Sequence, residues 1–294
     1  MSATKSITRV GISPFSAEQH IGVYRSFLVS IFTAKKTDGE TFLRIDDTNP
    51  KHTASINEMI NDMSKIIEPE LFSPISSGEL GRGTIGEKGI QAIFESSRLE
   101  LYDRYLTKLQ DDDYIFYDGG AAFFNVEKYI KTFGNLIDVS YQGKKNRVMQ
   151  IDKVMPNLRF PLAVNNKQRF LWHFTSVVDD VSLGVTHVVR AKDKIDNQVP
   201  QTIISKALDL SSPKYLYTKI MLCDEFLPTV DSLLARGIST KAIKSYLYGT
   251  ITGQSDKIYM SFKEALDDFS VESVLPGQFR FDLKKVLSIQ RNLS

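Results

Sequence analysis

The order of short apolar runs in the first 50 residues constrains the fold more than any other feature of the sequence. A β-rich run over residues 7–12 (ITRVGI) leads into a Ser-Pro loop, and apolar side chains then recur at helical spacing from His20 to about Lys35. A second β-rich run follows at 41–45. Because strand, crossover helix and strand form a right-handed parallel unit, this opening predicts an α/β fold with a parallel sheet.

The turn at which this helix begins predicts an anion site. The first turn of a helix carries backbone N–H groups without helical partners, and the helix dipole is positive there. A strand that leads into such a turn therefore favours phosphate. His20 would add a donor and Gly22 would let a nucleotide approach closely. The alternative is that His20 only caps a surface helix.

Five ordered segments resemble the motifs of one family. They are His20 to Val23 (HIGV), Leu43 to Pro50 (LRIDDTNP), Ser97 to Tyr102 (SRLELY) with Tyr114, Val177 to Asp193 (VVDDVSLGVTHVVRAKD), and Phe281 to Leu287 (FDLKKVL). The chain resembles the class I aminoacyl-tRNA synthetases, in particular the catalytic domain of the glutamyl- and glutaminyl-tRNA synthetase group. The corresponding motifs there are HIGH, L-R-[IF]-[ED]-D-T-[DN], Q-S-x-R-x-x-x-Y, V-V-D-D-x-x-x-G-I-T-H-V-I-R-G-E-D and F-D-x-x-K-L.

The resemblance implies a Rossmann-like parallel sheet of the class I synthetase type, with an inserted subdomain and a helical C-terminal part. We expect a first half of the sheet at 1–116, a shortened acceptor-binding-like insertion at 117–159, a second half at 160–221 and a helical, stem-contact-like region at 222–294. Within these parts the patterns predict helices at 53–67 and 88–110, a loop at 73–86, and sheet segments at Phe160, 174–178 and 186–190.

The resemblance also implies a two-substrate site in which the amino-acid carboxylate attacks the α-phosphate of ATP, which would bring Mg²⁺ with it. His20 is the expected catalytic residue. The expected ATP-binding residues are Ser13, His20, Gly22, Asp193 and Met221, and the expected amino-acid-binding residues are Arg9, Ser13, Asp46, Trp172, Ser176 and Arg190. No metal site of the protein's own is expected.

The two arginines among these residues indicate the charge of the substrate. An arginine fork binds a carboxylate through two hydrogen bonds, so Arg9 and Arg190 together suggest an acid with two carboxylates, such as glutamate. Asp46 would hold the substrate ammonium. The alternative for each arginine is a structural ion pair with a nearby acid.

Polar residues near these positions are expected to support the structure of the site. Asp47 and Thr48 are expected to fix the loop after residue 45 by local hydrogen bonds. Asp179 and Asp180 are compatible with a metal or acid–base pair, and the resembling group implies structural support of the site instead.

The chain departs from the family in several places. Trp172 and Ser176 stand where the family has Tyr and Asn, which puts strict glutamate specificity in doubt. The K-[ML]-S-K-[RS] loop, whose lysine neutralises the triphosphate, is missing, and residues 222–231 (LCDEFLPTVD) leave an acidic remnant that would repel phosphate. Lys219 or Lys194 could replace the lost lysine.

Composition adds limits. A chain of 294 residues with 42% hydrophobic content can bury a large core. It has no apolar run near 18 residues and no N-terminal signal pattern, which predicts a soluble, cytoplasmic protein without a membrane partner. The single cysteine, Cys223, excludes a disulfide framework and a thiolate zinc cluster.

The acceptor of the acyl group is the open question. The net charge is only +2, the insertion at 117–159 is short, and the sequence ends at Ser294 before an anticodon-binding domain. A mildly basic stretch at 128–159 is either a solvated face or a remaining RNA grip. We therefore expect little ordinary tRNA charging, and a small amine, a carrier protein or a restricted tRNA element as acceptor.

Three functions remain open from the sequence. The first is a ligase that activates glutamate or a related acid as the adenylate and transfers it to a non-standard acceptor. The second is a synthetase-like binding or regulatory protein without chemistry, and the third is a tRNA-modifying paralogue of glutamyl-tRNA synthetase. The sequence leaves the oligomeric state undefined.

Overall fold

The computed structural model describes residues 4–14, 18–49, 55–73, 82–85, 90–141 and 145–293. Its strands are β1 (Ile7–Ile12), β2 (Glu40–Ile45), β3 (Arg82–Ile85), β4 (Ile90–Phe94), β5 (Ile115–Asp118), β6 (Ala121–Asn125), β7 (Leu136–Tyr141), β8 (Lys145–Gln150), β9 (Arg159–Val164), β10 (Arg169–Phe170), β11 (His187–Ala191), β12 (Lys214–Leu222) and β13 (Gly277–Arg280). The α-helices are α1 (Ile21–Lys35), α2 (Ile56–Ser64), α3 (Leu99–Asp111), α4 (Val126–Phe133), α5 (Ile151–Val154), α6 (Trp172–Ser182), α7 (Gln198–Ala207), α8 (Val230–Leu234), α9 (Thr240–Thr252), α10 (Phe262–Asp268) and α11 (Leu283–Leu293). Short 3₁₀ turns occupy Pro69–Leu71, Glu95–Ser97, Lys192–Lys194 and Val271–Ser273.

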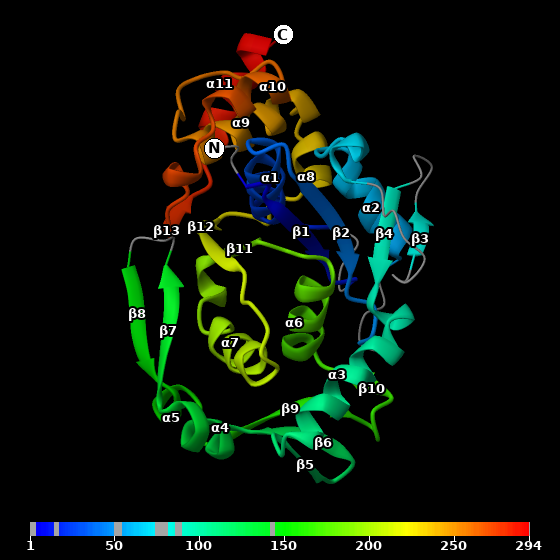
Figure 1. Ribbon diagram of the computed structural model, residues 1–294. Helices are drawn as coiled ribbons and strands as arrows, with labels where there is room; N and C mark the ends of the chain where they lie inside the picture. Colours follow the sequence, from blue (N-terminus) through cyan, green and yellow to red (C-terminus); the bar gives the residue numbers. More distant parts are fainter. Residues whose placement is uncertain are drawn as a thin grey trace.

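Parallel strands form the centre of the molecule, as predicted. β1 pairs with β2 and β2 with β4 in parallel, and β11, β12 and β13 form a second parallel set. The two sets adjoin at β1 and β11, because the Thr186 N–H donates to the Ile7 carbonyl at 2.9 Å and the Ile7 N–H donates to Thr186 Oγ1 at 2.8 Å. The Rossmann-like fold is thus confirmed (Figure 1).

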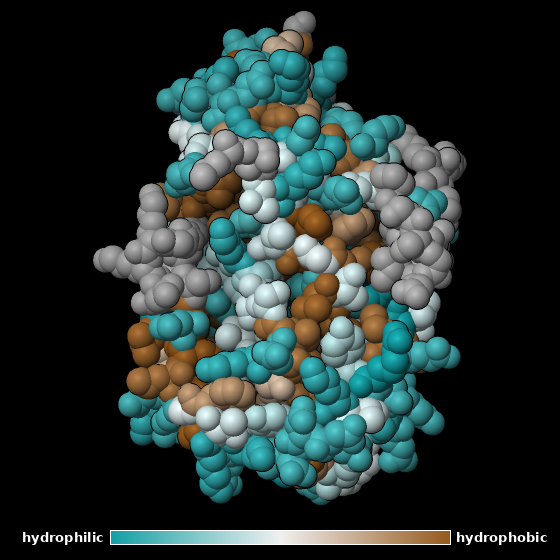
Figure 2. Space-filling model, viewed as in Figure 1, coloured by the Kyte–Doolittle hydropathy of each residue, from teal (hydrophilic) through white to brown (hydrophobic). Residues whose placement is uncertain are grey.

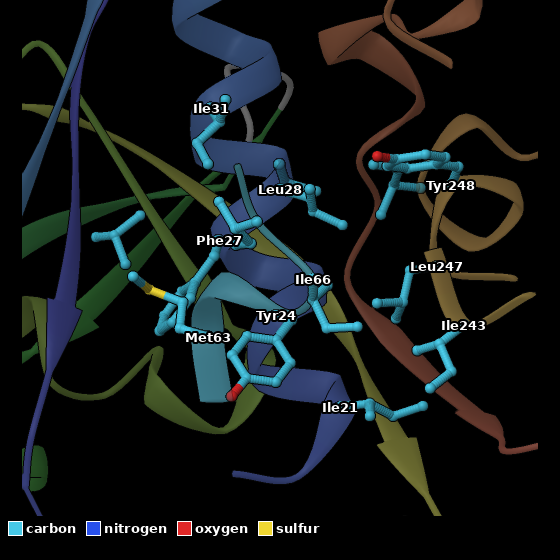
Figure 3. Close-up of a cluster of buried hydrophobic side chains, with 14 of the residues drawn as sticks. Ile21, Tyr24, Phe27, Leu28, Ile31, Met63, Ile66, Ile243, Leu247 and Tyr248 are labelled. Atoms are coloured by element: carbon cyan, nitrogen blue, oxygen red, sulfur yellow. The ribbon is translucent and has the colours of Figure 1, made fainter. Parts of the chain in front are cut away.

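Helix α1 connects this sheet to the C-terminal helices. Its 15 residues are buried on most sides, because the helix packs against β1, β2 and β11 and also against α9. Figure 3 shows Ile21 and Leu28 of α1 on the side of Ile243, Leu247 and Tyr248 of α9, whereas Tyr24 lies beside Met63 of α2. Each fully buried side chain of this kind stabilises the fold by about 1.5–3 kcal/mol. The start of α1 is therefore held rigidly above the sheet.

A second, antiparallel sheet has a hydrophobic core of its own. β5, β6, β9 and β10 make an antiparallel sheet, and α3, α6 and α7 pack with it around Phe124 and Leu162. β7 and β8 form a separate two-stranded hairpin. Figure 2 shows hydrophobic side chains gathered over this hairpin at the lower left, where Leu136 and Val148 are exposed. The division of the chain into four parts stays a prediction.

Several predicted elements are wrong. Residues 90–94 form strand β4 inside the predicted helix 88–110, and the helix begins only at Leu99. Residues 82–85, expected as loop, form β3. Residues 74–81 and 86 of that loop, 88–89 of the predicted helix 88–110, and 53–54 of the predicted helix 53–67 lie outside the described residues. The apolar pattern of Ile90–Phe94 fits a buried strand as well as a helix, and pairing with β2 decides the outcome.

The prediction for the second half of the parallel sheet is also partly wrong. Phe160 belongs to β9 in the antiparallel sheet, and residues 174–178 lie in helix α6 rather than in a strand. The region after residue 222 is mainly helical, and it also returns β13 to the sheet beside β12. None of the described helices is both long enough and apolar enough to cross a membrane.

Candidate active site

A cavity of about 870 Å³ opens at the C-terminal ends of the parallel strands. Ligands of open α/β sheets bind at this edge, where the strand order changes direction. Nine of the ten residues predicted for the site line the cavity: Arg9, Ser13, His20, Gly22, Asp46, Trp172, Arg190, Asp193 and Met221. Ser176 is absent from the lining and is fully buried.

His20 caps the start of α1 through one ring nitrogen and also lines the cavity. Nδ1 accepts a hydrogen bond from the Gly22 N–H at 2.9 Å. Because Nδ1 accepts, the neutral ring carries its proton on Nε2, which makes Nε2–H a donor. Burial lowers the pKa of His20 and so favours the neutral ring. The residue thus combines the capping role with a donor at the cavity wall.

The N–H groups of the first turn of α1 are not open, contrary to prediction. Ile21 N–H donates to the Pro228 carbonyl at 2.9 Å, Gly22 N–H to His20 Nδ1, and Val23 N–H to the His20 carbonyl at 2.9 Å. An antiparallel bridge between His20 and Thr229 holds the segment after β12 over this turn. The helix dipole remains, whereas the donors that would cradle phosphate are already used.

Gly22 has a steric reason to be glycine. A Cβ at this position would lie 2.8 Å from His20 Nδ1 and 3.2 Å from the Met221 Cβ. The absent side chain therefore allows the imidazole ring to fold back and Met221 to close the end of the cavity. Its role in the structure is to position His20 and Met221.

Arg9 forms a buried ion pair with Asp180, which was the structural alternative to its role in substrate binding. Its Nε and Nη2 donate to the two carboxylate oxygens of Asp180 at 2.5 and 3.2 Å, and both side chains are buried. Arg9 nevertheless lines the cavity. Asp179 likewise accepts from Arg98 Nε at 2.7 Å and from the Tyr102 hydroxyl at 3.0 Å. Both aspartates therefore make the contacts of structural support.

Arg44 is a central residue that the sequence interpretation missed. It is fully buried, and it donates to Asp46 Oδ1 at 2.8 Å, to Asp179 Oδ2 at 3.4 Å and to Ser176 Oγ at 3.3 Å. Coulombic attraction to the surrounding carboxylates raises the pKa of Arg44 against the opposing effect of burial. Ser176 is therefore a hydrogen-bond partner of Arg44 and does not line the cavity. The arginine in the segment Leu43 to Pro50 was the available signal.

A small charged cradle surrounds Gly11 at the cavity wall. A Cβ built on Gly11 would lie 3.5 Å from Arg9 Nη1, 3.8 Å from Arg44 Nη2 and 3.9 Å from Asp46 Oδ2. Two cationic groups and one carboxylate thus face the same open spot. This is the donor and acceptor set that complements the carboxylate and ammonium of an amino acid.

Arg190, on β11 beside β1, lines the same cavity with one nitrogen unsatisfied. Nη1 donates to Gln201 Oε1 at 2.6 Å, and the guanidinium lies 5.0 and 5.3 Å from the ring centroids of Trp172 and Tyr215. Nη2 is buried and has no hydrogen-bond partner among the described residues. Burial lowers the pKa of Arg190. A buried cationic donor without a partner is costly, so the arrangement favours an anionic ligand.

Glu95 is a second residue that the interpretation missed. It lines the cavity, is 2% exposed, and accepts from Thr175 Oγ1 at 2.8 Å and Thr48 Oγ1 at 3.2 Å. Burial, with a further contribution from Asp46, raises its pKa to about 8 despite Arg44. With Asp47, which accepts from the Ser96 N–H at 2.8 Å, Glu95 fixes the loop after β2 as predicted for Asp47 and Thr48.

The remaining predicted residues lie at the cavity rim. Ser13 is exposed beyond the end of β1, and Asp193 pairs with Lys194 at 2.7 Å. Met221 is buried next to the start of α1. Their nucleotide-binding roles stay predictions.

Comparison with known proteins places this geometry in a family. Residues 8–117 and 163–226 match the family described as tRNA synthetases class I (E and Q), catalytic domain. The chain is 24% identical to glutamate–tRNA ligase 1 of Petrotoga mobilis, over 91% of this chain and 60% of that one. It is 26% identical to the glutamate–tRNA ligase of Akkermansia muciniphila, over 95% and 63% respectively. The chain thus spans less than two thirds of these relatives.

Solved structures agree at the level of the fold. A glutamate-tRNA synthetase from Elizabethkingia anophelis matches with a TM-score of 0.75 and 16% identity, over 99% of this chain and 70% of that chain. The same values hold for a glutamate tRNA ligase from Elizabethkingia meningosepticum in complex with its amino acid. The chain belongs to the family of class I (E and Q) tRNA synthetase catalytic domains.

Proposed function

We propose that this protein is an ATP-dependent ligase that activates glutamate or a close relative as the adenylate. The observation that carries the proposal is that two groups complementary to an acidic amino acid line one cavity. The cradle at Gly11 suits the carboxylate and ammonium of an amino acid, and the unpartnered Arg190 Nη2 suits a second carboxylate. Several relatives are glutamate–tRNA ligases, which supports the same substrate class.

The charge of the inner site supports a substrate with one net negative charge. Four arginines, at 9, 44, 98 and 190, stand against the three aspartates at 46, 179 and 180. Burial raises the pKa of Glu95 to about 8, which favours its neutral form at neutral pH and so weakens its ability to balance the fourth arginine. A zwitterion would leave this excess positive charge in place, whereas a dicarboxylic amino acid offsets it.

The proposed chemistry is carboxylate attack on ATP. A carboxylate oxygen of the acid forms a bond to the α-phosphorus while the bond to the bridging oxygen breaks and pyrophosphate leaves. His20 Nε2–H would donate to a phosphate oxygen as negative charge develops, in a position fixed by its bond from Gly22. Arg9 and Arg44 would hold the acid in line for this attack. Mg²⁺ would arrive with ATP.

A non-catalytic binding protein is the second candidate. The Ile21–Pro228 hydrogen bond favours it, because it removes a backbone donor from the place where phosphates would be held. The lost lysine loop and the shortened insertion favour a non-standard acceptor over ordinary tRNA charging, and a small amine, a carrier protein or a restricted tRNA element each fit. A tRNA-modifying paralogue remains the third candidate.

Calorimetry with glutamate, glutamine and aspartate tests the substrate assignment. We expect glutamate to bind more tightly than glutamine, and Arg190→Gln to weaken glutamate binding by about 10- to 100-fold, since one charge-assisted hydrogen bond is lost. Glutamine binding should change much less in this variant. Equal binding of glutamate and glutamine by the wild type would contradict the role of Arg190.

A further inference from the structure

Backbone donors at the start of α1, the expected nucleotide end of the cavity, are not free to hold an outgoing pyrophosphate. The N–H groups of Ile21, Gly22 and Val23 are used within the protein, whereas His20 offers a side-chain donor at this turn. Charge on the β- and γ-phosphates grows as they leave, so a cation near them lowers the barrier. Among the residues that the structure describes, two lysines line the cavity, Lys194 and Lys219.

The two lysines differ in their partners. Lys194 Nζ pairs with Asp193 at 2.7 Å, which offsets its charge. Lys219 is exposed, and within the described ranges it makes no ion pair. The acidic remnant after β12 is partly neutralised as well, because Asp224 pairs with Arg280. Of the two, Lys219 thus has the charge available for a ligand.

The strand places the Lys219 side chain toward the nucleotide end. Side chains two residues apart on a strand leave it on the same face, so Lys219 shares a face with Met221, whose Cβ abuts the Gly22 position. Pairing with Gly277 of β13 and a 3.1 Å hydrogen bond from Arg25 Nη1 to the Lys219 carbonyl fix the backbone here. Gly277 lies beside the aliphatic part of the Lys219 side chain, because a Cβ at this position would be 3.6 Å from Lys219 Cγ.

We propose that Lys219 contacts the β- and γ-phosphates of the bound nucleotide and replaces the cation of the missing loop. The proposal rests on the proposed function only in that a nucleotide occupies this cavity. It predicts a contact with the leaving phosphates and none with the α-phosphate or the base. Lys219 would therefore discriminate ATP from AMP.

Binding constants for ATP, inorganic pyrophosphate and AMP, measured by calorimetry, test this. Lys219→Met should weaken ATP and pyrophosphate binding by about 10- to 100-fold and leave AMP binding within about twofold. Lys219→Arg should restore most of the loss. Lys214→Met is the matched control, because Lys214 is exposed on the same strand and lies outside the cavity lining.

The outcomes separate this proposal from the proposed function. An equal loss for ATP and AMP would show a structural role and overturn the proposal. So would unchanged ATP binding in Lys219→Met, or a wild type that binds neither ATP nor pyrophosphate. If the wild type binds ATP, Lys219→Met shows the predicted loss, and no amino acid is activated, the phosphate contact stands and the ligase function fails.

Discussion

Replacing Glu95 by glutamine should stabilise the protein increasingly as pH rises. Burial raises the pKa of Glu95 from 4.5 to about 8. Between these values the folded carboxyl keeps its proton while the unfolded one loses it, so folding takes up a proton and stability falls with increasing pH. The slope is about 1.4 kcal/mol per pH unit, or about 3 kcal/mol from pH ~5.5 to pH ~7.5.

Glutamine has the same shape and cannot ionise. Its carbonyl oxygen can still accept the hydrogen bond from Thr175 Oγ1, and its amide can donate to Thr48 Oγ1. Urea unfolding at several pH values should show the variant gaining on the wild type by about 3 kcal/mol over that range. Glu100→Gln, at an exposed position of α3, is the control and should show no such trend. A Glu95→Gln difference that is independent of pH would show that Glu95 is ionised at neutral pH, and the charge argument for a dicarboxylic substrate would fail.

Three substitutions and one binding assay probe the site, the core and the acceptor. His20→Ala removes the N-cap of α1, so it should cost only about 0.5–2 kcal/mol of unfolding free energy by urea titration while abolishing amino-acid-dependent ATP turnover. Asp180→Asn leaves Arg9 without its buried partner; we expect a loss of about 3–5 kcal/mol and weaker glutamate binding by calorimetry. Leu28→Ala, in the core against α9, should cost about 2–5 kcal/mol in the same titration with ligand affinity retained. Filter binding of total tRNA should be weak and should collapse between about 50 and 200 mM salt; salt-resistant binding with a stable aminoacyl ester would instead support a tRNA acceptor.

Local pattern predicted the first part of the fold well. The β1–α1–β2 unit follows from period-2 and period-3.6 spacing, and its observed bounds differ from the predicted ones by at most one residue. The same reasoning failed at residues 90–94 and 174–178. Apolar and β-branched residues occur in both places, and tertiary contacts make one a strand beside β2 and the other a helix against α7.

The site was predicted through motifs, and its electrostatics were not. Of the ten residues chosen from the family resemblance, nine line one cavity in the structure. The resemblance could not show that Pro228 covers the start of α1, because that contact joins segments far apart in the sequence. Arg44 and Glu95 escaped notice for a related reason. Their importance comes from burial and from neighbours on other elements, which no local pattern displays.

Amino-acid-dependent exchange of label between pyrophosphate and ATP tests the central claim most directly. The assay should use a panel of amino acids, with and without total tRNA, and His20→Ala as the inactive control. We predict slow exchange with glutamate or a close relative, independent of tRNA and absent in His20→Ala. A wild-type protein that binds ATP and glutamate yet exchanges no label with any amino acid would contradict the account and favour a binding protein.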